Sequence, residues 1–298
     1  MTKHNIHIPV MLDDVIENLN IQQNDRIIEG TAGFGGHTQN ILKKLDKSGL
    51  YIGIDQDKTA ISHSKNQFKE YPFAHHYHDN FSNFETYLTT HKHATFTKFF
   101  LDLGISSYQI DEASRGFSHR FDGPLDMRMN INNPIDAKEV INTYSADSLS
   151  DIFYHYGELR HNKKLVDNLI QTRKTNPLKT TTDLRNIIKK SYFFHNKRSL
   201  FMRTCSQIFQ AIRIEVNQEF KHIEKTLPKL ETYASNDAII IILTFHSCED
   251  RMIKQFIKQS KTLEFNPKSV IKPSKKERTN NSRSRSAKCR IITKKKSN

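Results

Sequence analysis

Apolar and polar residues alternate along the first hundred positions as expected of strands joined by helices. Short apolar runs that predict buried strands lie at residues 26–29, 50–54, about 73–77 and 96–102. Helical or loop stretches separate these runs, near residues 38–46, 57–69 and 81–91. Strands that alternate with helices predict βαβ units and a mainly parallel sheet.

Helical spacing dominates the middle of the chain. Apolar residues recur at helical intervals in three groups, which are Leu149, Ile152, Phe153 and Tyr156; Leu165, Val166, Leu169 and Ile170; and Leu184, Ile187, Ile188 and Tyr192. A long helix is predicted from about Ser206 to Thr226, with Pro228 beyond it. Strand character returns only at 238–243, a run apolar enough for a sheet covered on both faces. We therefore expect an α/β domain of residues 1–108 and 207–298, interrupted by an all-helical domain of residues 109–206.

Positive charge is concentrated at the C-terminal end. The formal net charge is +14, and residues 253–298 hold 15 Lys and Arg against two acidic residues, so the rest of the chain is close to neutral. Such a cationic block suits the phosphate backbone of RNA or DNA, and a merely solvated end is the alternative. We expect the segment from about Lys272 to be flexible and to order only on a partner.

Three cysteines, Cys205, Cys248 and Cys289, show neither paired nor metal-ligand spacing. The histidines at 75, 76 and 78 have no carboxylate or cysteine partner at a suitable spacing, so no metal is expected. No signal peptide is recognisable, and the longest apolar run is far too short to cross a bilayer. The expectation is a cytoplasmic protein without membrane contact.

Four of the ten glycines fall within residues 30–36, between a predicted strand and a predicted helix. Such a turn lets backbone N–H groups approach a ligand closely, although a glycine-rich turn without a ligand remains the alternative. The dinucleotide fingerprint of an NAD-dependent dehydrogenase would need a glycine where Thr38 stands. Glu29 suits a cationic ligand, and Asp55, at the end of the second strand, suits ribose hydroxyls. Together these residues point to S-adenosylmethionine.

Two further strand ends carry candidate chemistry. Asp102 follows the fourth strand and should converge with Glu29 and Asp55 at one edge of the sheet, facing the cofactor or the acceptor atom. A capping Asp in a turn would explain Asp102 equally well. His246 follows the last strand, where a substrate contact and a structural hydrogen bond are both open. Ser247 and Asp250 fit a capping box.

Longer strings spread over nearly the whole chain carry a resemblance. They are His7–Leu12, the glycine-rich turn, Gly53–Asp57, Asp102–Gln109, Pro124–Met129, Phe209–Ile214, Phe245–Ser247 and Arg283–Lys288. In these strings the chain resembles the RsmH (MraW) family, the cytosine-N4 methyltransferases of bacterial small-subunit (16S) rRNA.

The resemblance implies a Rossmann-like class I methyltransferase domain interrupted by an inserted all-helical domain. It also implies S-adenosyl-L-methionine as cofactor and, as partner, 16S rRNA within the small ribosomal subunit or a late precursor, with a homodimer as one oligomeric option. The implied cofactor site comprises Gly35, Gly36, His37, Asp55 at the ribose, Phe81 against the adenine, Asp102 and Gln109. We further expect RNA contacts from Asp126, Arg128, His246, Arg283 and Arg285.

Four departures from the family's pattern bear more on the helical domain than on the cofactor site. Glu29 stands in place of Asp, Leu159 in place of an acidic residue, Cys248 in place of Leu, and Arg203–Ile208 in place of His-Pro-Ala-Thr-Arg-Thr.

The chemistry requires help for a weak nucleophile, because the N4 lone pair of cytosine is delocalised into the ring. Asp102 or neighbouring backbone carbonyls are the candidates to accept the amino protons. A cytosine-C5 mechanism is disfavoured because it needs a cysteine beside a proline, and no Pro-Cys pair occurs. The alternative function is a non-catalytic RNA-binding ribosome-assembly factor with a methyltransferase-like fold.

Overall fold

The chain divides into two compact units. The computed structural model describes residues 9–295, apart from the side chains of residues 266–269. Unit 1 comprises Met1–Gly104 and Phe220–Asn298, and unit 2 comprises Ile105–Glu219. The first two residues of the string His7–Leu12 and the last three of the basic tail lie outside the described residues.

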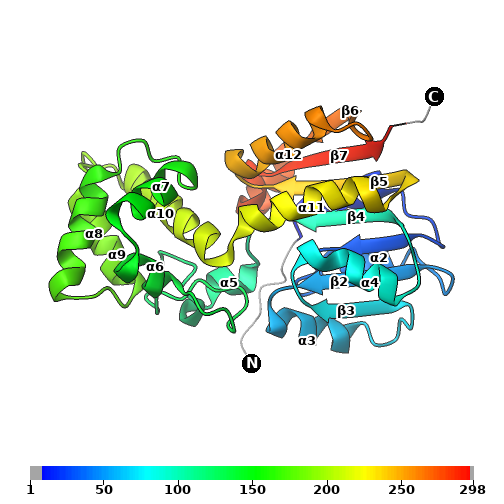
Figure 1. The fold of residues 1–298 in the computed structure, drawn as a ribbon, viewed down its shortest axis with the longest axis horizontal. Helices are drawn as coiled ribbons and strands as arrows, with labels where there is room; N and C mark the ends of the chain where they lie inside the picture. Colours follow the sequence, from blue (N-terminus) through cyan, green and yellow to red (C-terminus); the bar gives the residue numbers. More distant parts are fainter. Residues whose placement is uncertain (1–8, 296–298) are drawn as a thin grey trace. The chain divides into compact units, whose positions relative to one another are not determined.

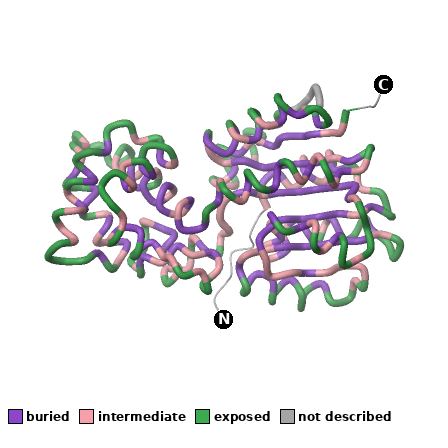
Figure 2. Tube along the Cα trace, in the orientation of Figure 1, coloured by how far each residue is buried: buried purple, intermediate pink, exposed green. Residues whose placement is uncertain are grey.

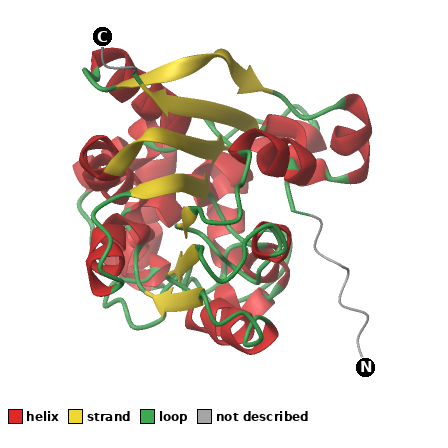
Figure 3. Ribbon diagram, turned by 90° about the vertical axis from the view of Figure 1, so that its right-hand side faces the viewer, coloured by secondary structure: helices red, strands yellow, loops and turns green. Residues whose placement is uncertain are grey.

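Within the described residues, unit 1 is built on a seven-stranded sheet of order β3-β2-β1-β4-β5-β7-β6 (Figures 1 and 3). The strands are β1 (Arg26–Glu29), β2 (Leu50–Asp55), β3 (Ala74–His78), β4 (Phe96–Asp102), β5 (Ala234–Thr244), β6 (Leu263–Ile271) and β7 (Lys288–Lys294). The first five are parallel, and β7 is antiparallel to β5 and β6. The four strands predicted in the first hundred residues are confirmed to within one residue. Chain order reverses between β1 and β4, so a ligand crevice is expected at their carboxyl ends.

Helices cover both faces of this sheet, as the Rossmann-like prediction requires. They are α1 (Leu12–Leu19), α2 (Thr38–Leu42), α3 (Lys58–Gln67), α4 (Phe84–Thr90), α11 (Glu219–Tyr233), α12 (Ser247–Gln259) and α13 (Lys275–Asn280), with short 3-10 turns η1 (Phe81–Asn83) and η3 (Ser282–Ser286). Ile28 and Phe99 pack into a cluster with α4, α11 and α12, whereas Ile27 and Phe100 pack with α1 and α2. Successive strand residues thus serve opposite faces, which leaves the strands buried along most of their length (Figure 2).

Unit 2 is helical. Its elements are α5 (Ser107–Asp111), η2 (Ala113–Arg115), α6 (Ala137–Thr143), α7 (Ala146–His155), α8 (Lys163–Thr175), α9 (Thr181–Ser191) and α10 (Arg198–Asn217). The structure divides the chain at 104/105 and 219/220, whereas the sequence pattern placed the divisions at 108/109 and 206/207. The second boundary moves because Ile208, Phe209 and Ile212 of α10 are buried in the core of unit 2.

The single helix predicted over 206–226 is wrong. Two helices occupy this region, and Gln218 separates them with a left-handed φ of 49°. Pro228 lies inside α11 rather than beyond a helix end. Within the described residues, no helix is both long and apolar enough to span a bilayer.

The flexible tail predicted from about Lys272 is also wrong for the described residues. Residues 288–294 form β7, which lies between β5 and β6, with Cys289, Ile291 and Ile292 buried. Arg290 is only 5% exposed, and its Nε donates to Asp250 Oδ1 at 2.5 Å. One of the charges that suggested a solvated tail, that of Arg290, is therefore neutralised by a residue 40 positions away.

Candidate active site

The glycine-rich turn after β1 is held in place by the strands on either side of it. Gly30 N–H donates to the carbonyl of Phe100 in β4 at 2.9 Å, and Ala32 N–H donates to the carbonyl of Ile54 in β2 at 3.0 Å. Both bonds extend the parallel ladder beyond the end of β1. The turn therefore begins from a fixed position at the carboxyl edge of the sheet, where the reversal of strand order predicts a ligand crevice.

Two glycines inside the turn adopt backbone angles that favour glycine. Gly33 has φ 52° and Gly35 has φ 86°. A Cβ on Gly35 would lie 2.4 Å from Cε2 of Phe68, so a larger residue does not fit there. Gly36 follows, half-buried, directly before the buried His37. The structure therefore places the three predicted residues Gly35, Gly36 and His37 on one tight bend.

Asp55 closes one side of this turn. Its Oδ2 accepts a hydrogen bond from Gly33 N–H at 2.8 Å, and its Oδ1 accepts one from Asp57 N–H at 2.8 Å. Burial raises the pKa of Asp55 to about 6, although both backbone donors oppose the rise. Each carboxylate oxygen has lone pairs left after these bonds, which suits the two hydroxyls of a ribose.

Glu29 does not face a ligand as the sequence suggested. It is 1% exposed, and its Oε2 accepts hydrogen bonds from Thr38 Oγ1 at 2.8 Å and from Tyr51 O–H at 2.5 Å. Burial raises the pKa of Glu29 to about 8, so the side chain is largely uncharged at neutral pH. Thr38, which departs from the dinucleotide fingerprint, thus anchors this carboxyl beneath the turn. Glu29 is therefore not placed to attract a cationic ligand.

Replacing Glu29 by Gln is expected to flatten the pH dependence of stability between about pH 5 and pH 8. The folded pKa of about 8 exceeds the ordinary value of 4.5, so the folded chain holds a proton that the unfolded chain releases. Stability therefore falls as pH rises through this window and levels off above the folded pKa. Gln cannot ionise, so the variant should lose a slope of up to about 1.4 kcal/mol per pH unit. Urea denaturation of both proteins across the window measures this, and equal slopes would contradict it.

Asp102 lies at the end of β4, next to the turn. Its backbone N–H donates to Thr31 Oγ1 at 2.7 Å, and its Oδ2 lies 3.9 Å from His37 Nδ1. Its Oδ1 is buried and has no hydrogen-bond partner among the described residues. Burial, followed by the charge of Glu249, raises the pKa of Asp102 to about 7. The capping function considered for this residue would have used a side-chain oxygen that the structure leaves unpaired.

His37 and Phe81 form walls of the turn rather than open surfaces. His37 is 5% exposed, and its Nε2 lies 3.1 Å from the carbonyl oxygen of Val10. Phe81 is 5% exposed, and its Cβ would be 2.7 Å from a Cβ on Gly30. The absence of a side chain at Gly30 therefore admits Phe81 to the base of the turn. The contact of Phe81 with the adenine remains a prediction.

His246 caps a helix, which corrects the predicted capping box. The N-cap of α12 is His246, and its N3 partner is Glu249, rather than Ser247 and Asp250. The N–H groups of Phe245 and His246 donate to Glu249 Oε2 at 3.0 and 3.4 Å. His246 Nε2 also lies 2.9 Å from Glu249 Oε1. The structural hydrogen bond left open for His246 is therefore present. Glu249 is fully buried. The sequence pattern did not single it out as a site residue, because an acidic residue in the first turn of a helix is also typical of a helix cap.

Three predicted site residues lie in unit 2. Gln109 is 5% exposed, and its Oε1 accepts from Ser106 N–H in the capping box of α5. Asp126 and Arg128 form a bidentate pair at 2.9 and 2.7 Å. Burial opposes ionisation of Asp126, yet the hydrogen bonds from Arg128 hold its pKa below the usual range. The pair therefore braces its own loop, and an RNA contact from either residue remains a prediction.

The predicted RNA-contacting arginines lie in η3, just before β7. Arg285 is exposed, and its Nε donates to the carbonyl of Arg278 at 3.2 Å. Arg283 is half-buried. Unlike Arg290, which Asp250 neutralises inside the sheet, Arg285 presents its guanidinium to solvent. Its contact with phosphate remains a prediction.

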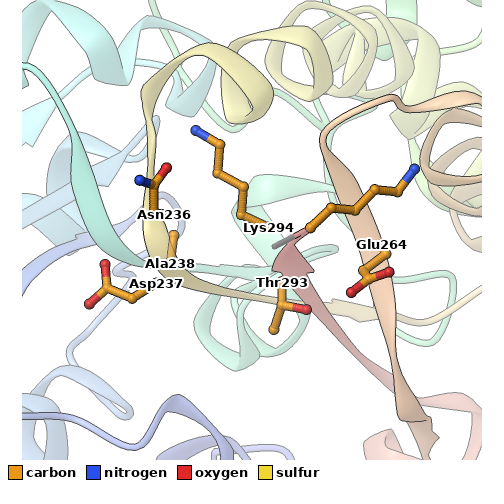
Figure 4. Close-up of a pocket in the computed structure, with 7 residues that line it drawn as sticks. Asn236, Asp237, Ala238, Glu264, Thr293 and Lys294 are labelled. Carbon is orange, nitrogen blue, oxygen red and sulfur yellow. The ribbon is translucent and has the colours of Figure 1, made fainter. Parts of the chain in front are cut away.

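A cavity of about 530 Å³ lies at the start of β5, whereas the glycine-rich turn follows the carboxyl end of β1. Figure 4 shows the side chains that line the cavity. It is lined by Asn236, Asp237, Ala238, Glu264, Thr293, Lys294 and Lys295. The two lysine ammonium groups donate to the carbonyls of Ala234 and Ser260 at 2.8 and 2.9 Å. This cavity sits where the parallel strands begin, and its cations are already paired, so it is not the predicted cofactor site.

Two histidines of β3 contact neighbouring residues of unit 1. His76 is 7% exposed and its ring stacks on Phe68 at 5.9 Å, while His78 Nε2 lies 2.9 Å from the carbonyl of Gln56. Across residues 9–295, no three His, Cys, Asp or Glu residues are grouped so that they could hold a metal ion.

The residues at the carboxyl edge of unit 1 fit an adenosylmethionine. The bend at Gly33 and Gly35 supplies a backbone cradle that a Cβ would obstruct at Gly35. Asp55 ends β2 at this edge with lone pairs that suit ribose hydroxyls, and Asp102 ends β4 there with a buried oxygen that has no hydrogen-bond partner among the described residues. The ribose hydroxyls and the amino group of adenosylmethionine need oxygen atoms that accept hydrogen bonds. A pyrophosphate would instead need backbone N–H donors and cations.

Comparison with known proteins agrees with this geometry. Residues 4–295 match the MraW methylase family. A protein of Mycoplasmopsis agalactiae named ribosomal RNA small subunit methyltransferase H is 40% identical, over 97% of this chain and 99% of that protein. A protein of the same name from Clostridium botulinum is 38% identical, over 97% and 98%. A solved rRNA methylase from Streptococcus thermophilus aligns over 96% and 94%, with a TM-score of 0.42 and 10% identity, too distant to support an inference about function.

The family match over residues 4–295 and the identities of 38% and 40% are sufficient to assign the family. The chain belongs to the MraW methylase family of S-adenosylmethionine-dependent methyltransferases.

Proposed function

We propose that this protein methylates the exocyclic N4 of a cytidine in the decoding region of bacterial 16S rRNA. The names of the Mycoplasmopsis and Clostridium relatives, both small-subunit rRNA methyltransferases, support the substrate class. The observation that carries the chemistry is the buried, unpartnered Oδ1 of Asp102 beside the glycine-rich turn. A carboxylate oxygen held there is suited to accept a proton from an amino group that is being methylated.

Bound S-adenosylmethionine supplies a methyl group on a positively charged sulfur, already activated for transfer. The protein must therefore hold the acceptor in line and improve a poor nucleophile. Asp102 Oδ1 accepts a hydrogen bond from the N4 amino group, which returns the lone pair from the ring to nitrogen. As the bond between N4 and the methyl carbon forms, the bond from that carbon to sulfur would break and leave S-adenosylhomocysteine, while one N4 proton would pass to the Asp102 carboxylate. The product amine is then neutral, and the proton leaves Asp102 for solvent.

The cellular setting follows from the same proposal. A target in the decoding region places the protein in the cytoplasm, acting on the small ribosomal subunit or a late precursor. Exposed basic side chains such as Arg285 would contact phosphates there. A homodimer remains one option for the active form.

Mass mapping of methylated cytidines in 16S rRNA tests the proposed function. Cells lacking this protein should lose the N4 methyl group of one decoding-region cytidine, and the purified protein with S-adenosylmethionine should restore it. Naked 16S rRNA and assembled small subunits, offered in parallel, identify the substrate form. An unchanged methylation map, with a defect in subunit assembly, would instead favour the non-catalytic assembly factor.

Replacing Asp55 by Ala is expected to weaken cofactor binding about 10- to 100-fold, since hydrogen bonds to a charged group are removed. Affinity of the unaltered protein should fall as pH drops below about 6, where Asp55 takes up a proton. Calorimetric titration with S-adenosylhomocysteine measures both effects, and Glu70→Gln, at an exposed acidic residue, is the matched control. Unchanged affinity in the Asp55 variant would remove this residue from the ribose site.

A further inference from the structure

The loop between α9 and α10 carries the most exposed large apolar side chain of the described residues. Phe193 is 79% exposed. We propose that residues 192–198 form a stacking site for an unpaired base of single-stranded RNA. This inference rests on the proposed RNA substrate and adds a second contact region, within unit 2, to the candidate active site.

The loop is anchored from behind, so its exposed ring is presented on a supported backbone. Tyr192 and Phe194 flank Phe193 and pack against the core of unit 2. The ring of Phe194 lies 5.1 Å from that of Phe201 in α10, and Lys197 N–H donates to the Phe194 carbonyl at 2.7 Å. Because the backbone around Phe193 is already held, a ligand that stacks on this ring has little loop entropy to overcome.

A second ring extends the surface. His195 lies with its ring centroid 4.3 Å from that of Phe193, at an interplanar angle of 69°. His195 and Asn196 both adopt left-handed backbone angles, with φ of 46° and 58°. These angles turn the chain sharply, so two neighbouring rings stand at one exposed bend. Aromatic surfaces of this kind bind bases with little sequence preference because every base has a π face.

The charge around the loop favours nucleic acid. Residues 184–214 include seven Lys and Arg and no Asp or Glu. Lys189 and Lys190, at the end of α9, and Lys197 and Arg198, at the start of α10, are exposed. A protein partner that buried Phe193 would prefer a continuous apolar face. Cations on both sides of an exposed aromatic ring are instead the combination found in single-strand binding grooves.

The test compares RNA binding by three variants, with a fluorescein-labelled oligouridine of about 12 nucleotides as the probe. Phe193→Ala should weaken binding about 5- to 100-fold, and Phe193→Trp should preserve it. Tyr154→Ala is the matched control. Tyr154 in α7 is also an exposed ring, 51% exposed and 4.9 Å from a histidine ring, but it lies outside residues 184–214, which contain no Asp or Glu. An RNA duplex of the same length should bind Phe193→Ala and the unaltered protein alike.

Salt dependence provides an independent measurement. Replacing both Lys189 and Lys190 by Ala should lower the log–log slope of oligouridine binding by about 0.7 for each phosphate that the variant no longer neutralises. Equal oligouridine affinity of Phe193→Ala and the unaltered protein would overturn the proposal. Loss of self-association in Phe193→Ala, seen by sedimentation without any change in RNA binding, would also overturn it and identify a second copy as the occupant. A failed methylation map would reject the proposed function while leaving a Phe193-dependent RNA affinity intact.

Discussion

Asp102→Asn is expected to lower the rate of methyl transfer to 16S rRNA by about 10²- to 10⁴-fold, the usual contribution of a positioned acid or base. The amide has nearly the shape of the carboxyl, so the backbone bond from Asp102 N–H to Thr31 Oγ1 should survive. What disappears is the carboxylate's ability to take up the N4 proton, because an amide oxygen can accept a hydrogen bond but is not basic enough to be protonated. Because the resemblance also implies Asp102 in the cofactor site, the rate is measured at saturating S-adenosylmethionine, and the affinity for S-adenosylhomocysteine is measured in parallel to separate loss of proton transfer from loss of cofactor binding.

The pH profile provides the second part of this prediction. The pKa of Asp102 is raised to about 7 by burial and by the charge of Glu249, and only the deprotonated carboxylate can accept a proton. The rate should therefore rise about tenfold per pH unit below this pKa and level off above it. Single-turnover transfer of labelled methyl groups measures the profile. Full turnover by Asp102→Asn at saturating cofactor would pass the proton-accepting role to neighbouring backbone carbonyls.

Glu249→Gln extends the same experiment to a residue that acts through Asp102. Removal of the Glu249 charge should lower the pKa of Asp102 and move the acidic limb of the rate profile to lower pH. A purely structural role would lower stability without moving that limb. An unshifted limb would therefore assign Glu249 to helix capping alone.

Arg290→Ala is expected to lower the free energy of unfolding by about 3 kcal/mol, because breaking a buried ion pair leaves an uncompensated charge. Arg290 Nε lies 2.5 Å from Asp250 Oδ1, and its guanidinium lies 5.1 Å from the Phe265 ring centroid. Lys288 Nζ, 2.7 Å from Asp250 Oδ2, retains part of the compensation. Urea denaturation measures the decrease.

Arg285→Ala is the control for this prediction, because Arg285 is exposed. It should change stability by less than about 0.5 kcal/mol and lower the salt slope of RNA binding. The opposite pattern, with Arg290→Ala fully stable and defective only in RNA binding, would make Arg290 a phosphate ligand.

Truncation after Lys272 should unfold unit 1 rather than release a tail, since it removes β7 from between β5 and β6.

The sequence alone predicted the five parallel strands, the glycine-rich bend and the family, but it did not predict β6 and β7. Buried strands such as 26–29 and 96–102 carry a local signal, because apolar residues stand next to one another at Ile27–Ile28 and Phe99–Leu101, where both faces of the sheet are covered. The glycines of the turn were equally readable, since a left-handed backbone at Gly35 admits few other residues. The acidic residues at strand ends followed from parallel topology, which brings the carboxyl ends to one edge.

The sequence pattern could not predict which residues, distant in the sequence, pair with a given charged side chain. From the sequence, Glu29 was predicted to face a ligand. In the structure, Thr38 and Tyr51 donate hydrogen bonds to its carboxyl group beneath the turn. Arg290 lies in a run whose positive charge is typical of a disordered tail. In the structure, Asp250 neutralises its charge. Charge composition sums residues without regard to pairing, and pairing at such separations exists only once the chain has folded.

The sequence by itself therefore determined the local chemistry: which segments form the parallel strands, where the backbone must bend and which family the chain resembles. Only the tertiary structure decided how each charge is used, leaving Asp102 with an unpaired oxygen while it pairs Glu29, Asp126 and Arg290 with neighbours. The physical reason is that the pKa and availability of a buried group depend on its desolvation and its contacts. Both are properties of the folded environment rather than of the residue.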